Sequence, residues 1–219
     1  MSEVLIACEM LRDELALAMA RTGSAPETVW LDRGLHDRPQ VLRDAILEQL
    51  DHLPADCELV LLGLSYCGGA LDGVGSPRAT LAVPRFDDCI RLILSLEPGQ
   101  RNAADSRSLY FTRQWMDSDR YIVRELAQYR KIYGPKRGEK IMRTMLANYR
   151  ELRLVDTGAY DLSACRAAAE ADAKTLGLAY GQQAGGVRVL EKLLRHEFDE
   201  EFCVVPPGGK LTQRQFLGI

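Results

Sequence analysis

The sequence has few cysteines and no long hydrophobic run. No stretch approaches the ~18 consecutive apolar residues that a membrane-spanning helix needs, and the N-terminus has neither a basic region nor a cleavage site for secretion. The six cysteines among 219 residues are too sparse for a secreted disulfide scaffold. We therefore expect a cytoplasmic chain whose cysteines are free, redox-active or bound to a metal.

The sequence also lacks the phosphate-binding motifs of common nucleotide-binding folds. The glycines of residues 63–75 are not followed by the Lys-Ser/Thr of a P-loop, and they do not fit Gly-x-Gly-x-x-Gly. This excludes Walker-type ATP hydrolysis and a standard dinucleotide site. The glycines still permit positive φ and close backbone approach, so Gly68 and Gly69 are candidate contacts for a phosphate or a metal cluster.

Positive charge is concentrated in the middle of an otherwise acidic chain. Residues 107–153 hold twelve Lys/Arg and five Asp/Glu, although the whole chain has a net charge of −3. Such a segment can face an anionic ligand or partner, or form a solvated pair of amphipathic helices. Tyrosines and a tryptophan are interleaved with its arginines, but no nucleic-acid motif accompanies them, so we do not expect a nucleic-acid partner.

The hydrophobic pattern predicts an α/β protein built on a mostly parallel sheet. Short apolar strands alternate with segments of helical periodicity, which is typical of a Rossmann-like doubly wound fold. The expected strands span residues 3–7, 27–32, 58–63, 80–83, 152–155, 178–182 and 202–205, and 108–112 is a further strand or an extended segment. The expected helices span residues 9–22, 38–52, 86–95, 114–133, 136–149, 161–177 and 186–196.

We expect two similar α/β lobes that face each other across a crevice. The N-terminal lobe covers residues 1–106, and a basic helical connection covers 107–150. The C-terminal lobe covers 151–208, and the tail 209–219 carries no strong signal.

Three cysteines follow predicted strands directly. Cys8 follows strand 3–7, Cys67 lies in the loop after strand 58–63, and Cys89 follows strand 80–83. Ligands of open α/β sheets bind at the carboxyl ends of strands, and three thiolates suit Zn²⁺ or an iron–sulfur cluster with one open position. A redox disulfide between two of them is an alternative, as are three unrelated small residues in loops. The other cysteines, by contrast, are expected to be buried packing residues: Cys57, Cys165 and Cys203.

Further polar residues are expected near the same edge. His36 is a candidate fourth ligand or acid/base group, or equally a residue whose hydrogen bond orders its loop. Glu9 follows Cys8 directly and is a candidate catalytic carboxylate. Arg85 could hold an anionic substrate or pair with a nearby aspartate. Asp156 follows strand 152–155 and could line the crevice from the other lobe, or belong to an ordinary turn.

Several motifs together resemble one known family. They occur in order along the chain, at residues 6–15, 34–39, 62–69, 83–90 and 202–208. They are similar to those of a bacterial and archaeal domain-of-unknown-function family, numbered sixteen thirty-eight, over roughly residues 3–208. The resemblance implies cysteines at the positions of Cys8, Cys67 and Cys89 and a histidine at that of His36. This chain departs from the family in having Asp87, where the family has a histidine.

The family's members often occur in anaerobes that use corrinoid-dependent methyl transfer, so the resemblance implies one-carbon chemistry. We therefore expect a metal-dependent transferase or lyase that acts on a small molecule or a corrinoid-related protein, and no membrane. A non-catalytic accessory protein or metallochaperone that docks through residues 107–153, and a thiol redox protein, are the alternatives. The sequence leaves the oligomeric state open.

Overall fold

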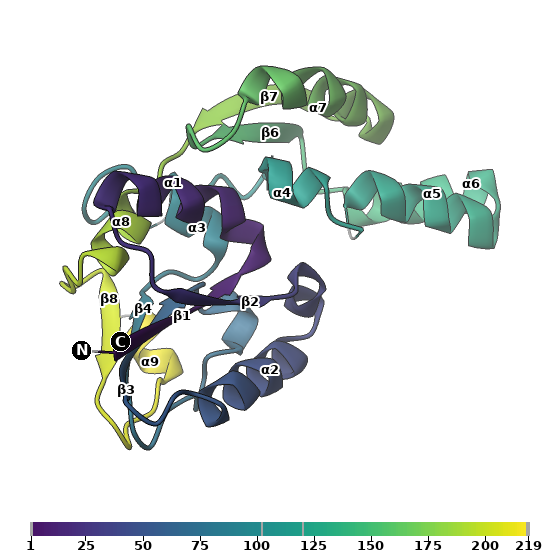
Figure 1. Cartoon of the computed structure of the whole chain (residues 1–219). Coiled ribbons are helices and arrows are strands. Elements are labelled where there is room, and N and C mark those ends of the chain that lie inside the picture. The colour runs from purple at the N-terminus through teal and green to yellow at the C-terminus, as the bar shows by residue number, and fades with distance from the viewer. Residues whose placement is uncertain (1, 102, 120, 218–219) are drawn as a thin grey trace. The chain divides into compact units, whose positions relative to one another are not determined.

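The computed structural model describes residues 2–101, 103–119 and 121–217, apart from the side chains of Asp37 and Leu217. The chain forms two compact units (Figure 1). The first contains Met1–Ala103 and Gly186–Ile219, and the second contains Ala104–Gly185.

A five-stranded sheet is the centre of the first unit. Its order is β2-β1-β3-β4-β8, and all neighbours are parallel except β8, which runs antiparallel to β4. Buried parallel strands require apolar side chains on both faces, and β1 and β3 consist mainly of such residues. The strands are β1 (Ser2–Cys8), β2 (Glu27–Leu31), β3 (Cys57–Gly63), β4 (Thr80–Pro84) and β8 (Phe202–Val205).

Helices cover both faces of this sheet, with α1 and α8 together on one face and α2 on the other (Figure 1). Helix α2 turns Leu42, Ile46 and Leu50 inward at helical spacing, and all three are buried. The α-helices of the unit are α1 (Arg12–Thr22), α2 (Pro39–Asp51), α3 (Cys89–Leu94), α8 (Arg188–Leu194) and α9 (Gln213–Leu217). Its 3-10 helices are η1 (Glu9–Leu11), η2 (Arg33–Asp37) and η3 (Cys67–Gly69).

A second, three-stranded parallel sheet with the order β5-β6-β7 forms the core of the second unit. Leu152 and Leu154 of β6 are fully buried and pack in one cluster with Ala169 and Ala173 of α7. The elements are β5 (Ser108–Phe111), α4 (Arg113–Met116), α5 (Ile122–Tyr133), α6 (Pro135–Met145), β6 (Glu151–Asp156), α7 (Leu162–Leu176) and β7 (Ala179–Ala184).

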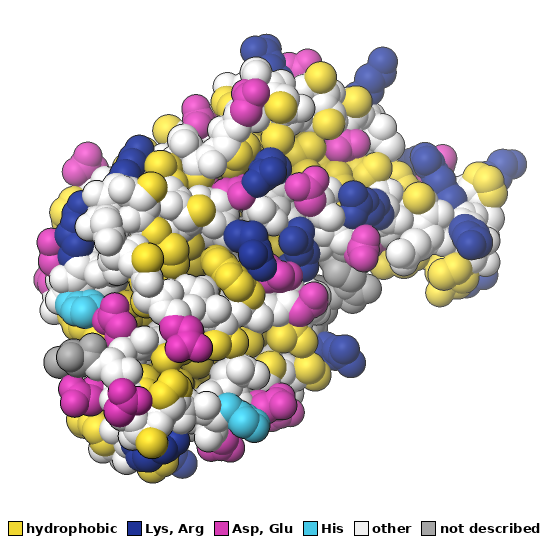
Figure 2. Space-filling model, viewed as in Figure 1, with side chains coloured by type: hydrophobic (Ala, Val, Ile, Leu, Met, Phe, Trp, Pro, Cys, Tyr) yellow, Lys and Arg dark blue, Asp and Glu magenta, His cyan; other side chains and the backbone are white. Residues whose placement is uncertain are grey.

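The basic segment, predicted as a helical connection over 107–150, begins with β5 of the three-stranded sheet, and its α5 and α6 form an antiparallel hairpin. The helices approach closely at Gly138, where a β-carbon would stand 2.6 Å from the backbone nitrogen of Arg130. Figure 2 shows Lys and Arg side chains mixed with hydrophobic ones over this hairpin. Two of its hydrophobic side chains are unusually exposed, Ile132 by 66% and Met145 by 49%.

The fold class is confirmed, because the protein is a Rossmann-like α/β protein with mostly parallel sheets. The prediction of a C-terminal lobe over residues 151–208, however, differs from the structure. The second unit is Ala104–Gly185, and the chain from Gly186 onward belongs to the first unit. There β8 pairs with β4, because its apolar residues complete the edge of that sheet. That the two α/β units face each other across a crevice stays a prediction.

The tail is structured over its described residues 209–217, in contrast to its weak sequence signal. Leu211 and Phe216 are 0% and 2% exposed, so both side chains belong to the core of the first unit. The backbone of Leu211 exchanges hydrogen bonds with the glycine-rich loop, accepting from Gly73 at 2.8 Å and donating to Val74 at 2.7 Å. The tail therefore pairs with the loop that follows β3.

Candidate functional site: a cysteine and histidine cluster

Four side chains that the sequence singled out come from four neighbouring parallel strands. Cys8 is the last residue of β1, and His36 lies in η2 after β2. Cys67 begins η3 after β3, and Cys89 begins α3 after β4. The chain proceeds in opposite directions from β1 and β3, so the carboxyl ends of these strands form the topological switch point where such sheets bind ligands.

The four side chains are in contact in two pairs. Cys8 Sγ lies 2.7 Å from His36 Nε2, and Cys67 Sγ lies 3.9 Å from Cys89 Sγ. His36 also interacts with the Cys67 side chain, which joins the two pairs into one cluster. All three cysteines are free thiols and buried, at 1%, 9% and 6% exposure in chain order.

The cluster perturbs the protonation of its members. Burial disfavours the imidazolium, yet hydrogen bonds with Cys67 and Cys8 raise the pKa of His36 to about 11. Hydrogen bonds from Cys89 and then His36 lower the pKa of Cys67 against the effect of burial, while the pKa of Cys89 is raised by Cys67 and by burial. The arrangement therefore favours a Cys67 thiolate held between a Cys89 thiol and a His36 imidazolium.

The backbone at Cys67 is held in a sparsely populated conformation. Cys67 has a φ of 46°, and the following Gly68 and Gly69 have φ of 66° and 96°. Only glycine adopts this region freely, and a non-glycine residue there requires support from its surroundings. Support comes from the segment after β4, because the Cys67 amide donates to the Asp87 carbonyl at 2.9 Å. The glycines thus serve the turn that carries Cys67.

Local capping fixes the other cysteines. The Asp88 carboxylate accepts a hydrogen bond from the Arg91 amide at 2.8 Å, which caps α3 and sets Cys89 as its first residue. The Cys8 thiol accepts a longer hydrogen bond, 3.4 Å, from the Met10 amide. The Asp87-Asp88-Cys89 sequence therefore has a structural role in the positioning of the third thiol.

Sequence reasoning missed three residues that hold the Cys67 loop. The ring of Tyr66 lies 4.7 Å, centroid to centroid, from that of Phe216 in α9. Arg101 then connects the tail to the segment before Cys89, because one of its nitrogens donates to the carbonyls of Phe216 at 3.0 Å and Arg85 at 2.6 Å. The sequence signal for this contact is the apolar pair Phe216-Leu217 after the polar stretch 212–215.

The remaining candidates lie outside these contacts. Glu9 is engaged by two arginines, Arg12 at 2.8 Å and Arg33 at 3.6 Å. The Arg85 guanidinium has a buried Nε without a hydrogen-bond partner among the described residues. Asp156 belongs to the second unit, where its carboxylate accepts from the Gly158 amide at 3.1 Å. The structure therefore gives Glu9 a local ion-pair role and Asp156 a turn role.

The other three cysteines are also buried. Cys57 begins β3, at the opposite end of that strand from the site. Cys165 lies in α7 in the core of the second unit, and Cys203 lies within β8. Within the described part of the chain, no group of three or more His, Cys, Asp or Glu side chains is already arranged to hold a metal ion.

Fold and site together define a Rossmann-like α/β protein with a Cys/His cluster at its switch point. Residues 30–194 match the model of the family described as "Protein of unknown function (DUF1638)", and the chain belongs to this family. The match includes His36, Cys67 and Cys89, whereas Cys8 precedes it. No curated protein and no solved structure matches the chain. None of the helices in the described ranges has the length and hydrophobicity needed to cross a membrane.

Proposed function

We propose that this protein is a metal-dependent enzyme whose centre is held by Cys8, Cys67 and Cys89, with His36 as the fourth group. The metal is Zn²⁺ or the iron of an iron–sulfur cluster. The observation that carries the proposal is the meeting of these side chains from four adjacent strand ends, at the position where α/β sheets bind ligands. The free state of all six cysteines supports a reducing, cytoplasmic environment.

The donor set fits such a centre in its chemistry and partly in its spacing. Two sulfurs on a tetrahedral zinc with Zn–S of about 2.3 Å stand about 3.8 Å apart, close to the 3.9 Å between Cys67 and Cys89. A nitrogen and a sulfur on the same ion stand about 3.5 Å apart, so Cys8 and His36, now 2.7 Å apart, would have to separate. Metal binding would then break their hydrogen bond and release protons.

His36 is the group that we propose to exchange with substrate. Three thiolates satisfy three positions of the centre, and a fourth position that opens is what distinguishes catalytic from structural sites. Once bound, a thiolate-held zinc would activate a substrate thiol, and an open cluster iron would act as a Lewis acid. The displaced imidazole, buried beside Cys67, would accept the substrate proton at Nε2.

Methyl transfer is the reaction class that we favour, with a small-molecule thiol or a corrinoid-related protein as partner. Transfer to a thiol requires that the thiol lose its proton before its sulfur attacks the methyl carbon, and that the methyl donor leave with the electron pair of the broken bond. A buried cluster with an adjacent imidazole supports this first step. The partner assignment follows from the chemistry of the donor set and from the family resemblance.

A thiol redox function is the second candidate, and one observation favours it. The 3.9 Å between the sulfurs of Cys67 and Cys89 requires only a modest movement to reach the ~2.05 Å of a disulfide. In that reaction the Cys67 thiolate attacks a small-molecule disulfide. This attack forms a mixed disulfide on Cys67 and releases one small-molecule thiolate. The Cys89 sulfur loses its proton and attacks Cys67 Sγ, which forms the Cys67–Cys89 bond and releases the second thiolate, so the small-molecule disulfide is reduced as the two cysteines are oxidised.

Metal and sulfide analysis of anaerobically purified protein tests the metal proposal. We expect close to one metal centre per chain, and we expect Cys8→Ser, Cys67→Ser and Cys89→Ser each to lose most of it. Cys57→Ser is the matched control, because Cys57 is buried in the same sheet at the far end of β3, and it should keep the centre.

Two results would reject the metal proposal. One is a protein that stays metal-free after reconstitution with zinc or with iron and sulfide. The other is equal metal content in the Cys67→Ser and Cys57→Ser variants. A Cys67–Cys89 disulfide that forms with oxidised glutathione in the metal-free protein would instead support the redox function.

A further inference from the structure

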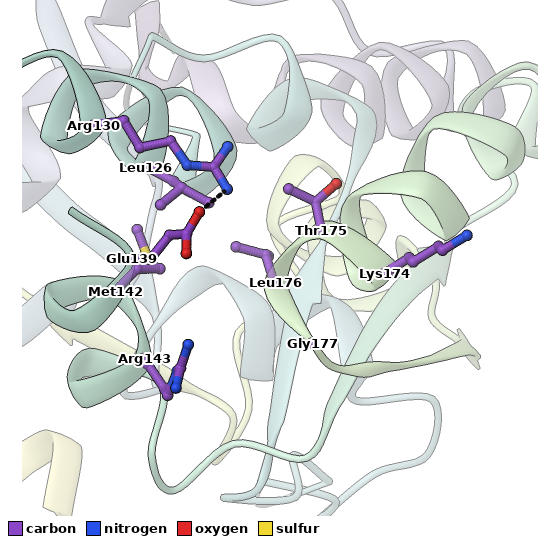
Figure 3. A pocket seen from close by; sticks show the side chains of 9 residues that line it. All are labelled: Leu126, Arg130, Glu139, Met142, Arg143, Lys174, Thr175, Leu176 and Gly177. Atoms are coloured by element: carbon purple, nitrogen blue, oxygen red, sulfur yellow. Dashed lines mark hydrogen bonds and ion pairs between the residues drawn. The ribbon is translucent and has the colours of Figure 1, made fainter. Parts of the chain in front are cut away.

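The second unit contains a cavity that no part of the proposed metal chemistry uses. It has a volume of about 300 Å³ and lies between α5, α6 and the C-terminal end of α7 (Figure 3). This volume is at the lower end of the range for small-molecule sites. All of its lining residues belong to the second unit, so the cavity is defined within one compact body.

The wall of the cavity has an apolar part. Leu126 of α5 and Met142 of α6 are each 3% exposed and pack in one hydrophobic cluster, with Leu176 of α7 against them. Figure 3 shows these side chains between the α5–α6 hairpin and the end of α7. Leu176 is the partly exposed member of the three, so it offers the apolar surface that a ligand can contact, over the buried Leu126 and Met142. Such a surface can cover an apolar group but cannot satisfy a polar one.

The charged part of the wall is predominantly basic. Arg130, Arg143 and Lys174 face a single acid, Glu139, which is paired with Arg130 at 3.0 Å. The two point toward one another in Figure 3, so the one carboxylate of the wall is neutralised. Arg143 and Lys174 thus give the cavity a net positive charge.

The end of α7 does not cancel this charge. The last carbonyls of a helix carry negative partial charge and attract cations. Here the carbonyls of Ala173 and Lys174 accept backbone hydrogen bonds, from Leu178 at 2.9 Å and Gly177 at 3.2 Å. The αL cap at Gly177 therefore satisfies two of the last carbonyls of α7, which reduces their attraction for cations.

We propose that this cavity binds a small organic anion. Its apolar body packs on Leu126, Met142 and Leu176, and its carboxylate, sulfonate or phosphate group pairs with Arg143. Lys174 lies at the rim with its ammonium directed outward in Figure 3, and it contributes by raising the local potential rather than by direct contact. This site is independent of the cysteine and histidine cluster.

Two fluorescent probes of nearly equal shape test the proposal in the full-length protein. Anilinonaphthalene sulfonate is an organic anion, and phenyl-naphthylamine is its uncharged counterpart. We expect the anion to bind the wild type at least about tenfold more tightly than the neutral probe, since a guanidinium–anion hydrogen bond is charge-assisted. We expect Arg143→Ala to weaken anion binding about tenfold and Lys174→Ala about threefold, with the neutral probe little changed.

Lys140→Ala is the matched control, because Lys140 is an exposed cation on α6 that does not line the cavity. It should leave the affinity for the anion within about twofold of the wild type. Equal affinities for the anion and the neutral probe, or an unchanged anion affinity in Arg143→Ala, would overturn the proposal. Unchanged anion binding in that variant would mean that the probe binds elsewhere, such as at the exposed Ile132 and Met145. A circular dichroism melt establishes that each variant is folded.

Discussion

Glu201 is a buried carboxylate on which the assembly of the first unit depends. Its side chain is 2% exposed and accepts two hydrogen bonds from Arg188, each at 2.7 Å, and one from Lys192 at 2.9 Å. It directly precedes β8, and its backbone carbonyl accepts from the Arg85 amide at 2.7 Å. The ion cluster thereby connects α8 to the strand that returns to the sheet.

The magnitude of this contribution follows from the carboxyl group. Hydrogen bonds from Arg188, opposed by burial and assisted by Lys192, lower the pKa of Glu201 from 4.5 to about 2. Such a change corresponds to about 3 kcal/mol of folding free energy when the carboxylate is charged. Because the pKa is lower in the folded chain, the stabilisation is complete above about pH 5 and disappears as the pH falls toward about 2.

Glu201→Gln measures this contribution. The variant keeps the shape but leaves Arg188 without its carboxylate partner and Lys192 with only Asp199. We therefore expect the free energy of unfolding to fall by about 3 kcal/mol at neutral pH. Urea unfolding across the acid range should show the difference from the wild type shrinking toward zero. Glu197→Gln is the control, because Glu197 is an exposed neighbour, and it should lower the free energy of unfolding by less than about 0.5 kcal/mol. If the free energy of unfolding of the wild type exceeds that of Glu201→Gln by the same amount at every pH down to about 2, the reasoning is refuted.

Three further perturbations follow from contacts in the two units. Gly138→Ala should destabilise the second unit by about 1–3 kcal/mol in thermal unfolding, since its β-carbon would meet the α5 backbone at 2.6 Å. A variant as stable as the wild type would contradict this close approach of the two helices. Phe216→Ala should lower the free energy of unfolding by about 3–5 kcal/mol and accelerate hydrogen exchange of the Cys67 amide. Leu96→Ala, which truncates an exposed side chain, should do neither. Exchange of the Cys67 amide as slow in Phe216→Ala as in the wild type would mean that the tail does not hold the loop. His36→Gln should raise the pKa of Cys67 in metal-free protein, measured by thiolate absorbance, because the imidazole helps to lower it; an unchanged titration would remove His36 from the cluster.

The sheet of the first unit could largely be predicted from local patterns. The apolar runs of β1 and β3 and the periodicity of α2 are each encoded within a few residues. Because parallel strands place their carboxyl ends at one edge, the meeting of Cys8, Cys67 and Cys89 followed from the order of elements. The neighbouring position of His36 required only that β2 flank β1.

The division into units could not be predicted in the same way. The antiparallel pairing of β8 with β4 joins segments more than 100 residues apart, such as Ala82 and Val204, and no local signal specifies a partner at that separation. The anchoring of the tail depends on Phe216 reaching Tyr66, a tertiary contact without periodicity. The positive φ of Cys67 is likewise supported by a tertiary hydrogen bond to the Asp87 carbonyl, which the loop sequence does not reveal.

X-ray absorption of the anaerobically loaded protein at the metal edge tests the central claim most directly. For zinc, the account predicts a first shell of three sulfurs at about 2.3 Å and one nitrogen at about 2.0–2.1 Å, with the nitrogen lost in His36→Gln. For a cluster, the iron edge should show thiolate and sulfide sulfur, with sulfur scattering reduced in Cys89→Ser. A first shell of only oxygen and nitrogen, or a sulfur shell identical in wild type and Cys89→Ser, would contradict the assignment of these residues as the metal site.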